Sequence, residues 1–471
     1  MANRNEYTEL PKAFCALMQN WLGTEATSLF EALASPPTRG LRLSGCKAMP
    51  LHIPSLLVPH LNASIPWTPD GYYIDVDAAL GKTVLHEAGA YYLQEPSAMA
   101  IALAVAPQTG ERILDLCAAP GGKTTHLASL LSRAGGGRLV ANEFHPTRVR
   151  ALAENIERVG ARAAIVNESP DRLATAWPSA FDAVLVDAPC SGEGMFRKDP
   201  QAANQWQADS PDRCQMRQQE ILISAIKLLK PGGRLVYSTC TFNPLENERI
   251  VAWLLDSFPL SIDPLPEWPG WSSGRPEWAF DRPELLGTRR LWPHLARGEG
   301  HFVARLRLAE DALPMQTTRV RAVRPTKNRR DWSAWLSSTV ADPPSTFVQP
   351  RIQKDMIFSD ELGDLPTDGL RVLRPGCPLA TWKTDQFSPH HALSRALPAN
   401  AFPSSIELDE AEAMAYLRGE ALDNPKDLRG FVHLAYAGYG LGFAKGAPGR
   451  LNNLYPKGLR SAHLEPLERP H

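Results

Sequence analysis

The chain has 471 residues, of which 44% are hydrophobic and 21% charged, a composition ordinary for a globular protein of about three domains. A net charge of -1 excludes a protein that is basic throughout, but it leaves room for a local nucleic-acid surface. Seven cysteines without a Cys-x-x-Cys pair argue against a disulfide framework and a zinc ribbon, so we expect a reducing cytoplasmic location and no metal. The apolar stretch 98–106 is far shorter than the roughly 20 residues of a membrane-spanning helix, so we expect no membrane partner.

The first unit along the chain, residues 1–95, is predicted to be a small mixed domain that positions or binds the substrate. Prolines recur between residues 36 and 69, so a long helix is expected only over 11–33. The N-terminal ten residues are polar and lack an apolar segment of the signal-peptide type.

Residues 96–308 alternate between strand and helix patterns. Strands are expected at 112–116, 138–142, 163–166, 181–186, 234–238 and 301–308, and helices at 123–132, 146–159, 213–229 and 246–258. This alternation predicts an α/β fold with a doubly wound, mostly parallel sheet. The Pro- and Trp-rich segment 263–287 is predicted to be a surface insertion.

The last third of the chain is predicted to form a basic arm, 309–375, and a compact unit, 376–471. The basic residues of the arm are Arg319, Arg321, Arg324, Lys327, Arg329 and Arg330. The compact unit ends with cations interleaved with aromatic residues, namely Lys445, Arg450, Lys457 and Arg460 with Phe443 and Tyr455. Aromatic rings can stack on unpaired bases while cations contact phosphates, so we expect an RNA-binding face here.

A glycine-rich loop follows the first strand of the predicted sheet and indicates a cofactor site. Its residues are Cys117, Ala118, Ala119, Pro120, Gly121, Gly122 and Lys123. A phosphate-binding P-loop would need glycine at position 117, which argues against an NTPase, and the G-x-G-x-x-G of dinucleotide binding is absent. Glu143 ends the next strand about 20 residues later, where a ribose-binding carboxylate belongs. A ribose without a phosphate, beside acids such as Asp115, fits S-adenosylmethionine.

Two cysteines, Cys190 and Cys240, follow the fourth and fifth predicted strands. A lone cysteine at a strand end is more often a small buried apolar residue than a nucleophile. In the strand order expected for this class, however, these two strands are neighbours, and ligands bind outside their carboxyl ends. We therefore expect both thiols to lie beside the cofactor loop, near Gly121.

Two thiols beside a methyl donor suit methylation of a pyrimidine ring at carbon. C5 of cytosine is a weak nucleophile, and a thiolate that adds at C6 activates it, so covalent catalysis divides one hard step into easier ones. An acid near N3 would stabilise the charge that develops on the ring, and Asp187 is placed for this. Methylation at nitrogen would favour Asp/Asn-Pro-Pro-aromatic instead of Asp187-Ala-Pro-Cys190.

Together these segments resemble the Nol/Nop/Sun family of RNA cytosine-C5 methyltransferases. The segments that carry the resemblance are Asp115–Thr124, Asn142–Glu143, Asp187–Gly194 and Ser238–Thr241. Tyr91–Ser97, Phe196–Asp199 and Arg290–His294 resemble the RsmF-like branch, which modifies bacterial 16S rRNA, and Leu441–Arg460 resembles its PUA-like RNA-binding module. The resemblance covers nearly the whole chain and implies a Rossmann-like methyltransferase domain with a seven-stranded sheet, a small N-terminal domain and a C-terminal PUA-like domain.

The resemblance also implies roles for individual residues. Cys240 would be the nucleophile and Cys190 would assist release of the product, while the 117–123 loop, Glu143 and Asp187 would hold S-adenosylmethionine and the cytosine. The family usually places an Asp after the third strand to contact the adenine. Here the aligned position is Ser169, and Asp171 could substitute.

Some alternatives stay open at this point. Cys190 is the rival nucleophile, because DNA cytosine methyltransferases use the cysteine of their Pro-Cys motif, although they lack an equivalent of Thr239-Cys240-Thr241. The expected substrate is 16S rRNA within the 30S subunit, bound by a monomer. The alternatives are a tRNA cytosine-C5 methyltransferase and a non-catalytic RNA-binding assembly factor, against which the intact thiol pair, Asp187 and Glu143 argue.

Overall fold

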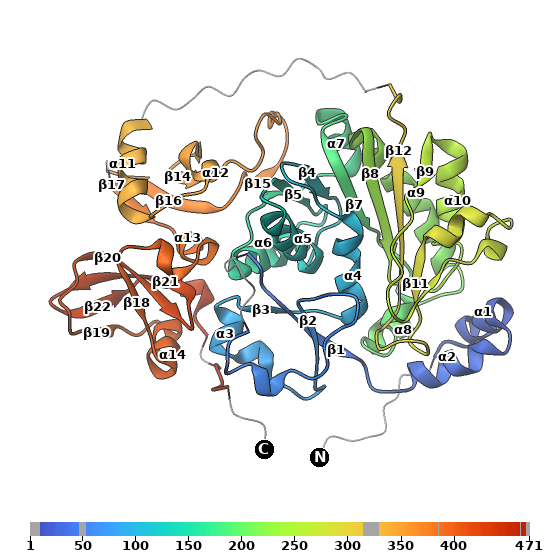
Figure 1. Cartoon of the computed structure of the whole chain (residues 1–471), viewed down its shortest axis with the longest axis horizontal. Helices are drawn as coiled ribbons and strands as arrows, with labels where there is room; N and C mark the ends of the chain where they lie inside the picture. Colours follow the sequence, from blue (N-terminus) through green and yellow to red (C-terminus); the bar gives the residue numbers. More distant parts are fainter. Residues whose placement is uncertain (1–9, 47–52, 314–328, 385, 462, 468–471) are drawn as a thin grey trace.

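A ten-stranded mixed sheet forms the centre of the molecule in this computed structural model, which describes residues 10–46, 53–313, 329–384, 386–461 and 463–467 (Figure 1). Its strands are β4 (Arg112–Asp115), β5 (Arg138–Asn142), β6 (Ala164–Val166), β7 (Phe181–Asp187), β8 (Leu229–Thr239), β9 (Leu260–Ile262), β10 (Trp271–Ser273), β11 (Arg289–Leu291), β12 (His301–Leu308) and β15 (Val372–Arg374). Along the sheet the order is β10-β11-β12-β8-β7-β4-β5-β6-β15, and β9 also pairs with β12.

Seven of these strands form the predicted Rossmann-like unit. They follow one another as β6-β5-β4-β7-β8-β12-β9, and only β12 runs against the other six. The α/β fold class is therefore confirmed, while the sheet is wider than expected, because β10 and β11 extend one edge and β15 the other.

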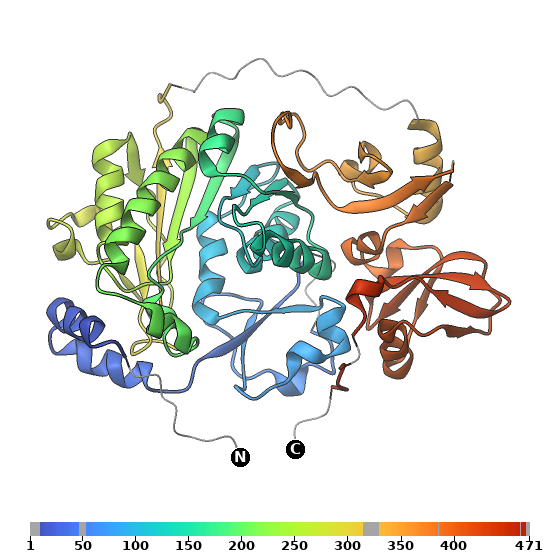
Figure 2. The same cartoon turned by 180° about the vertical axis from the view of Figure 1, so that it is seen from behind.

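Helices cover both faces of the sheet, as Figures 1 and 2 show from opposite sides. These helices are α4 (Pro96–Val105), α5 (Gly122–Arg133), α6 (Arg148–Val159), α7 (Pro170–Ala176), α8 (Pro200–Gln205), α9 (Ser210–Leu228) and α10 (Glu248–Ser257). Successive strand residues point to opposite faces, so Ile113 packs in the core under α4 and α5 while Leu114 packs in the core under α7 and α9. Both faces of the parallel strands are thus buried, which explains their continuous apolar runs. Within the described residues no helix has the length and apolarity to cross a membrane.

The N-terminal unit differs from the single long helix expected over 11–33. Two helices, α1 (Lys12–Leu22) and α2 (Glu25–Leu33), are separated at Gly23, whose φ of 58° lies in the left-handed region. The remaining elements are β1 (Arg39–Leu43), β2 (Gly71–Ile74), α3 (Val84–Glu87) and β3 (Tyr91–Leu93), and the strands form one antiparallel sheet. Phe14 of α1 packs edge-to-face on Phe196 and Trp206 of the methyltransferase unit.

The Trp-rich segment 263–287 is not a surface insertion, contrary to the expectation. It contributes β10, which extends the sheet, and it buries Leu265, Trp271 and Leu285 against the two main cores. Its prolines suggested a loop, and its buried residues are spaced too irregularly along the chain to show a strand or helix pattern.

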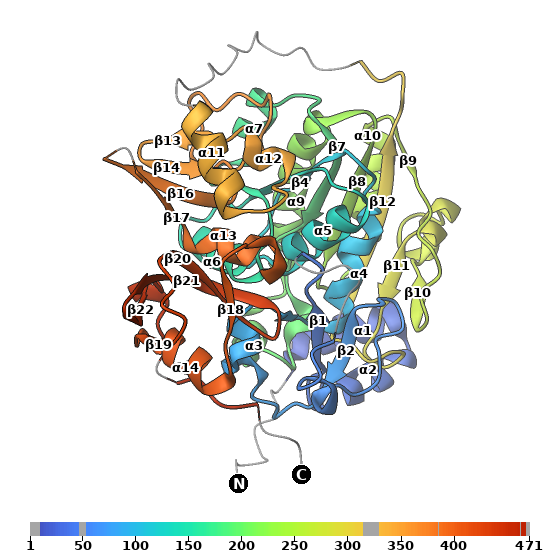
Figure 3. The same ribbon diagram turned by 60° about the vertical axis from the view of Figure 1, so that its left-hand side comes forward.

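The C-terminal third contains two further sheets (Figure 3). Its elements are α11 (Arg329–Thr339), α12 (Ser345–Val348), β13 (Arg351–Gln353), β14 (Met356–Phe358), β16 (Pro378–Lys383), β17 (Gln386–Pro389), α13 (His391–Ala396), β18 (Ser405–Glu407), α14 (Glu410–Arg418), β19 (Leu422–Asn424), β20 (Gly430–Tyr436), β21 (Tyr439–Ala447) and β22 (Gly449–Asn453). The predicted arm is only in part a linker, because β15 joins the central sheet beside β6. Tyr91 and Tyr416 belong to one core that the N- and C-terminal units share.

Candidate active site

The two candidate thiols lie at the carboxyl ends of neighbouring strands. β7 pairs in parallel with β8, with Asp187 opposite Ser238, and the chain continues from these ends to Cys190 and Cys240. The sulfur of Cys190 lies 3.3 Å from the sulfur of Cys240, and both side chains are half-buried. The convergence inferred from strand order is therefore present in the structure.

The protonation of Cys190 follows from this contact. The pKa of the Cys190 thiol is raised well above its usual value, mainly by its hydrogen bond with Cys240 and secondly by burial. A thiol in this state keeps its proton at neutral pH, which suits it to handle a proton rather than to attack a ring.

Asp187 forms an ion pair at the edge of the thiol pair. Its Oδ2 lies 2.6 Å from Nζ of Lys123, and Ser238 Oγ donates a 2.7 Å hydrogen bond to its Oδ1. Burial by itself would raise the pKa of Asp187, but the nearby charge of Lys123 leads the effects that hold this pKa below its usual range. Asp187 is thus an ionised acceptor in this structure, and Lys123 carries the donor protons of the pair. The role of Asp187 near N3 of the cytosine stays a prediction.

The 117–123 loop is held from three sides by other parts of the chain. Arg148 donates to the carbonyl of Ala119 (2.9 Å), Asn155 to that of Pro120 (2.9 Å), and the buried Arg42 of β1 to that of Gly122 (3.4 Å). The peptide between Ala119 and Pro120 is cis, and Gly121 has a φ of 111°, which favours glycine. Helix α5 begins directly after this turn, so its first N–H groups face the carboxyl edge of the sheet.

Two side chains at the start of this loop are buried. Burial raises the pKa of the Cys117 thiol, so Cys117 is expected to be unreactive. Asp115 accepts a 2.7 Å hydrogen bond from Thr124 at Oδ2, while its buried Oδ1 has no partner in the described structure. An unsatisfied buried oxygen is costly, and a ligand donor at this position would remove the cost. This free acceptor thus fits a ligand that donates from amino or hydroxyl groups, such as S-adenosylmethionine.

The predicted ribose and adenine contacts lie at the ends of β5 and β6. The backbone N–H of His145 donates to Oε1 of the buried Glu143 (2.8 Å), and Arg148 lies 3.5 Å from its Oε2, so the carboxylate is fixed and retains lone pairs for a ribose. Ser169 is the residue before α7. Its hydrogen bond to the exposed Asp171 is the main reason why the pKa of Asp171 is lowered. The two adenine candidates therefore lie together, and the choice between them stays a prediction.

His301 is a site residue that the sequence reasoning missed. The ladder between β12 and β8 begins at Phe302–Thr239, so His301, the first residue of β12, lies just beyond this pair, and the charges of Lys123 and Asp187 both act on its imidazole. Its Nδ1 lies 2.6 Å from Oγ of Ser97, which in turn donates to Glu95. Burial lowers the pKa of His301 to about 4, so the imidazole is neutral at pH 7. The sequence indicates only that a strand starts at His301. That this residue lies near the site becomes clear once β12 is known to pair with β8.

The C-terminal face is corrected by the structure. Phe443 packs against Phe402 and His433, and Tyr455 against Tyr416, so these aromatic rings belong to the core and cannot stack on bases in this state. The four cations named with them, Lys445, Arg450, Lys457 and Arg460, are exposed. Residues 314–328, which contain four of the six basic residues named in the predicted arm, lie outside the described residues.

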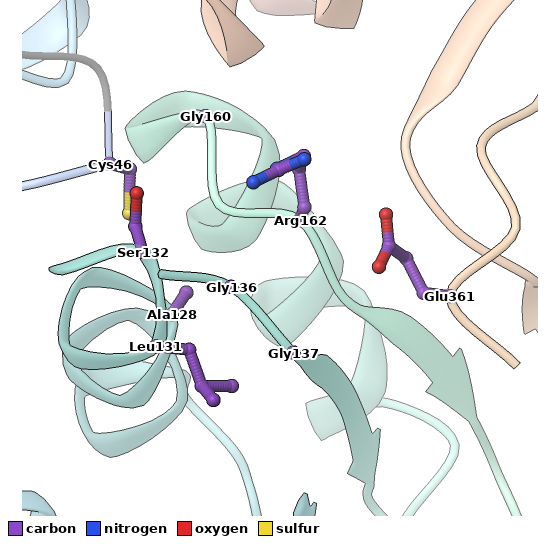
Figure 4. Close-up of a pocket in the computed structure, with 9 residues that line it drawn as sticks. All are labelled: Cys46, Ala128, Leu131, Ser132, Gly136, Gly137, Gly160, Arg162 and Glu361. Carbon is purple, nitrogen blue, oxygen red and sulfur yellow. The ribbon is translucent and has the colours of Figure 1, made fainter. Parts of the chain in front are cut away.

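A separate pocket lies away from these groups. It is lined by residues such as Gly136, Gly137 and Arg162, which precede β5 and β6 (Figure 4). In a parallel sheet this is the amino edge, opposite the edge that carries the thiols and the loop. Ligands of such folds bind at the carboxyl edge, so this pocket is not part of the candidate active site.

Comparison with known proteins matches the chain in three consecutive parts. Residues 10–96 match the N-terminal domain of 16S rRNA methyltransferase RsmF, residues 102–307 match 16S rRNA methyltransferase RsmB/F, and residues 403–461 match the methyltransferase RsmF PUA domain. The fold and the site thus define an S-adenosylmethionine-dependent RNA methyltransferase.

Individual relatives agree with these matches over their full length. The chain is 33% identical to ribosomal RNA small subunit methyltransferase F of Klebsiella pneumoniae over 98% of both chains, and 32% identical to that of Erwinia tasmaniensis over 95% of this chain and 96% of the relative. The protein belongs to the RsmF-like branch of the Sun family, which the sequence motifs indicated.

Solved structures show the same fold in the methyltransferase part. A methyltransferase homologue from Pyrococcus horikoshii has a TM-score of 0.55 and 29% identity, over 63% of this chain and 95% of its own. NSun6 from Pyrococcus horikoshii with SFG also has a TM-score of 0.55, at 22% identity over 65% of this chain and 100% of its own, and it supports the fold alone.

Proposed function

We propose that this protein methylates C5 of a cytosine in 16S rRNA, with Cys240 as the nucleophile and Cys190 as the residue that assists release. The observation that carries the proposal is the 3.3 Å contact between the two sulfurs, beside the Lys123–Asp187 pair. The 16S rRNA substrate follows from the names of relatives that the chain matches over nearly its full length. Action on the 30S subunit, as a monomer in the cytoplasm, belongs to the same proposal.

The residues that would hold S-adenosylmethionine are the 117–123 loop, Asp115 and Glu143, with Ser169 or Asp171 at the adenine. Bound there, the cofactor supplies the methyl group as an electrophile. Asp115 would accept a hydrogen bond from the cofactor at its free Oδ1, and Glu143 would accept hydrogen bonds from the ribose hydroxyl groups.

The thiols would act on the ring in sequence. The Cys240 thiolate adds to C6, which opens the C5=C6 double bond and makes C5 nucleophilic. Lys123, whose ammonium group lies against Asp187, would stabilise the negative charge that then spreads over the ring. After methylation a solvent water takes the proton from C5, the electron pair of the C5–H bond re-forms the C5=C6 double bond, and the C6–S bond breaks to release the Cys240 thiolate. Cys190, which keeps its own proton, would assist this last step.

The test compares single cysteine variants in methyl transfer from labelled cofactor to naked 16S rRNA, 30S subunits and tRNA, with mapping of the modified base. Cys240→Ala should abolish transfer, while Cys190→Ala should accumulate a covalent protein–RNA adduct on a denaturing gel. Cys15→Ala, on helix α1, is the matched control and should turn over normally. Full turnover by Cys240→Ala would overturn the assignment, and modification of tRNA alone would overturn the substrate.

A further inference from the structure

Two buried glutamates lie behind the thiol pair. Glu193 follows Cys190 by three residues, Glu246 follows Cys240 by six, and both side chains are fully buried. The mechanism above uses neither of them. A buried carboxyl must be hydrogen-bonded or neutral to be tolerated, so its partners show what it does.

Hydrogen bonds connect these glutamates through the residues next to the two cysteines. The backbone N–H of Ser191 (3.0 Å) and Nε2 of Gln218 (2.8 Å) both donate to Oε2 of Glu246. Oε1 of Glu246 lies 2.5 Å from Oγ of Ser191, which lies 2.8 Å from Oγ1 of Thr241. Thr241 in turn is hydrogen-bonded to Glu193.

The direction of this chain follows from the donors available. To an ionised Glu246 the Ser191 hydroxyl donates at Oε1. Oε2 already accepts two N–H groups, so a proton on this carboxyl belongs on Oε1, and the direction of this bond then reverses, with Glu246 donating to Ser191 Oγ. The Ser191 hydroxyl is then free to donate to Thr241, and the Thr241 hydroxyl to Glu193. Burial first, and the charge of Glu193 second, raise the pKa of Glu246 to about 8, so this proton is present at neutral pH.

We propose that Glu246, through the chain Glu246–Ser191–Thr241–Glu193, is a positioning residue that holds the two catalytic thiols in contact. Ser191 follows Cys190 directly and Thr241 follows Cys240 directly, so their hydrogen bond ties the two cysteine loops together. A second tie runs parallel to it, from the N–H of Gly194 to the carbonyl of Cys240 (2.9 Å). The role of the thiols as a catalytic pair rests on the proposed function.

Loss of the Glu246 proton would reverse part of the chain. The Ser191 hydroxyl would turn to the new carboxylate and stop donating to Thr241, and a second buried charge would face Cys190. Around Glu246 the other titratable groups are Glu193, Cys214 of α9 and Tyr237 of β8, with Arg290 of β11 acting on Glu193. Burial raises the pKa of Cys214 to about 11 and raises the pKa of Tyr237 well above its usual value, so neither gains charge near pH 8.

The test uses two variants of Glu246 and two measurements. Glu246→Gln keeps an N–H that can donate to Ser191, whereas Glu246→Ala removes the chain. Single-turnover methyl transfer between pH 6.5 and 9.5 should fall with an apparent pKa near 8 in the wild type, while Glu246→Gln should lose less than threefold at pH 7 and lack this alkaline fall. Glu246→Ala should lose at least tenfold at pH 7. Glu220→Gln, on the exposed face of α9, is the matched control.

Cross-linking of the thiols supplies a readout that needs no RNA. Diamide takes two hydrogens from Cys190 and Cys240 as their disulfide forms, and peptide mass spectrometry measures its rate. At pH 7 this rate should fall at least fivefold in Glu246→Ala and less than twofold in Glu246→Gln. Should Glu246→Ala unfold, Thr241→Val, which removes only the hydroxyl, should show the same slowing.

Equal losses in Glu246→Gln and Glu246→Ala, or an unchanged alkaline fall in Glu246→Gln, would overturn the positioning role. So would wild-type cross-linking in both Glu246→Ala and Thr241→Val. Failure of the proposed function appears differently, as absence of 5-methylcytosine from every RNA while cross-linking still responds to Glu246.

Discussion

Removal of one partner of the buried Arg290–Glu248 pair should destabilise the protein strongly. Arg290 Nε lies 2.6 Å from Glu248 Oε1 and its Nη2 2.5 Å from Oε2, and the two side chains are 1% and 0% exposed. The guanidinium also donates to the carbonyl of Phe242 (3.0 Å) and lies against the rings of Trp278 and Trp292. A substitution therefore leaves an unpaired charge in an apolar, aromatic setting.

The magnitude follows from this burial. Breaking a buried ion pair on one side costs about 3–5 kcal/mol, which corresponds to a fall in Tm of roughly 6–20 °C for a domain of this size. Arg290→Met and Glu248→Gln should each show this loss in urea unfolding and in thermal melts. The exposed pair Lys82–Glu465 is the matched control, and Lys82→Met should cost at most about 1 kcal/mol.

A double-mutant cycle sharpens the test. Glu248→Gln together with Arg290→Met removes both charges, so it should be less destabilised than the sum of the single variants. Single variants within about 1 kcal/mol of the wild type, which is the scale of an exposed pair, would refute the view that this pair is desolvated.

Two further predictions concern the site itself. Gly194→Ala should slow methyl transfer at least tenfold and should also lower the stability of the protein. The added Cβ would lie 2.9 Å from the backbone oxygens of Cys240 and Gly300, which is too close. Wild-type kinetics in this variant would show that these loops can separate freely. Asp115→Asn should remove a pH dependence of stability: burial raises the pKa of Asp115 to about 7, so the wild type loses stability as pH rises from about 4 to 7. In urea unfolding, the free energy of unfolding of the variant minus that of the wild type should be roughly 4 kcal/mol larger at pH 8 than at pH 4. The same difference at both pH values would contradict this prediction.

The sequence by itself determined the fold class, the cofactor loop and the pairing of the two thiols. Period-2 and period-3.6 patterns are local, and they located β4, α5 and β7 to within two residues, while β8 begins at Leu229, five residues before its expected start. The neighbouring positions of β7 and β8 follow from the strand order of the class. The contact between Cys190 and Cys240 could be expected for that reason, because each thiol follows its strand by only a few residues.

Tertiary structure decided what depends on partners distant in sequence. The sequence places Phe443 and Tyr455 among cations, yet the fold buries both rings, because residues 439–444 of β21 are all buried in the core and Tyr455 packs on Tyr416. His301 enters the site only because β12 pairs with β8, and β15, which begins at Val372, completes the sheet beside β6, which ends at Val166. The protonation state of Asp187 is set by Lys123 and that of Glu246 by burial, and such effects of nearby charge and desolvation arise only when the chain is folded.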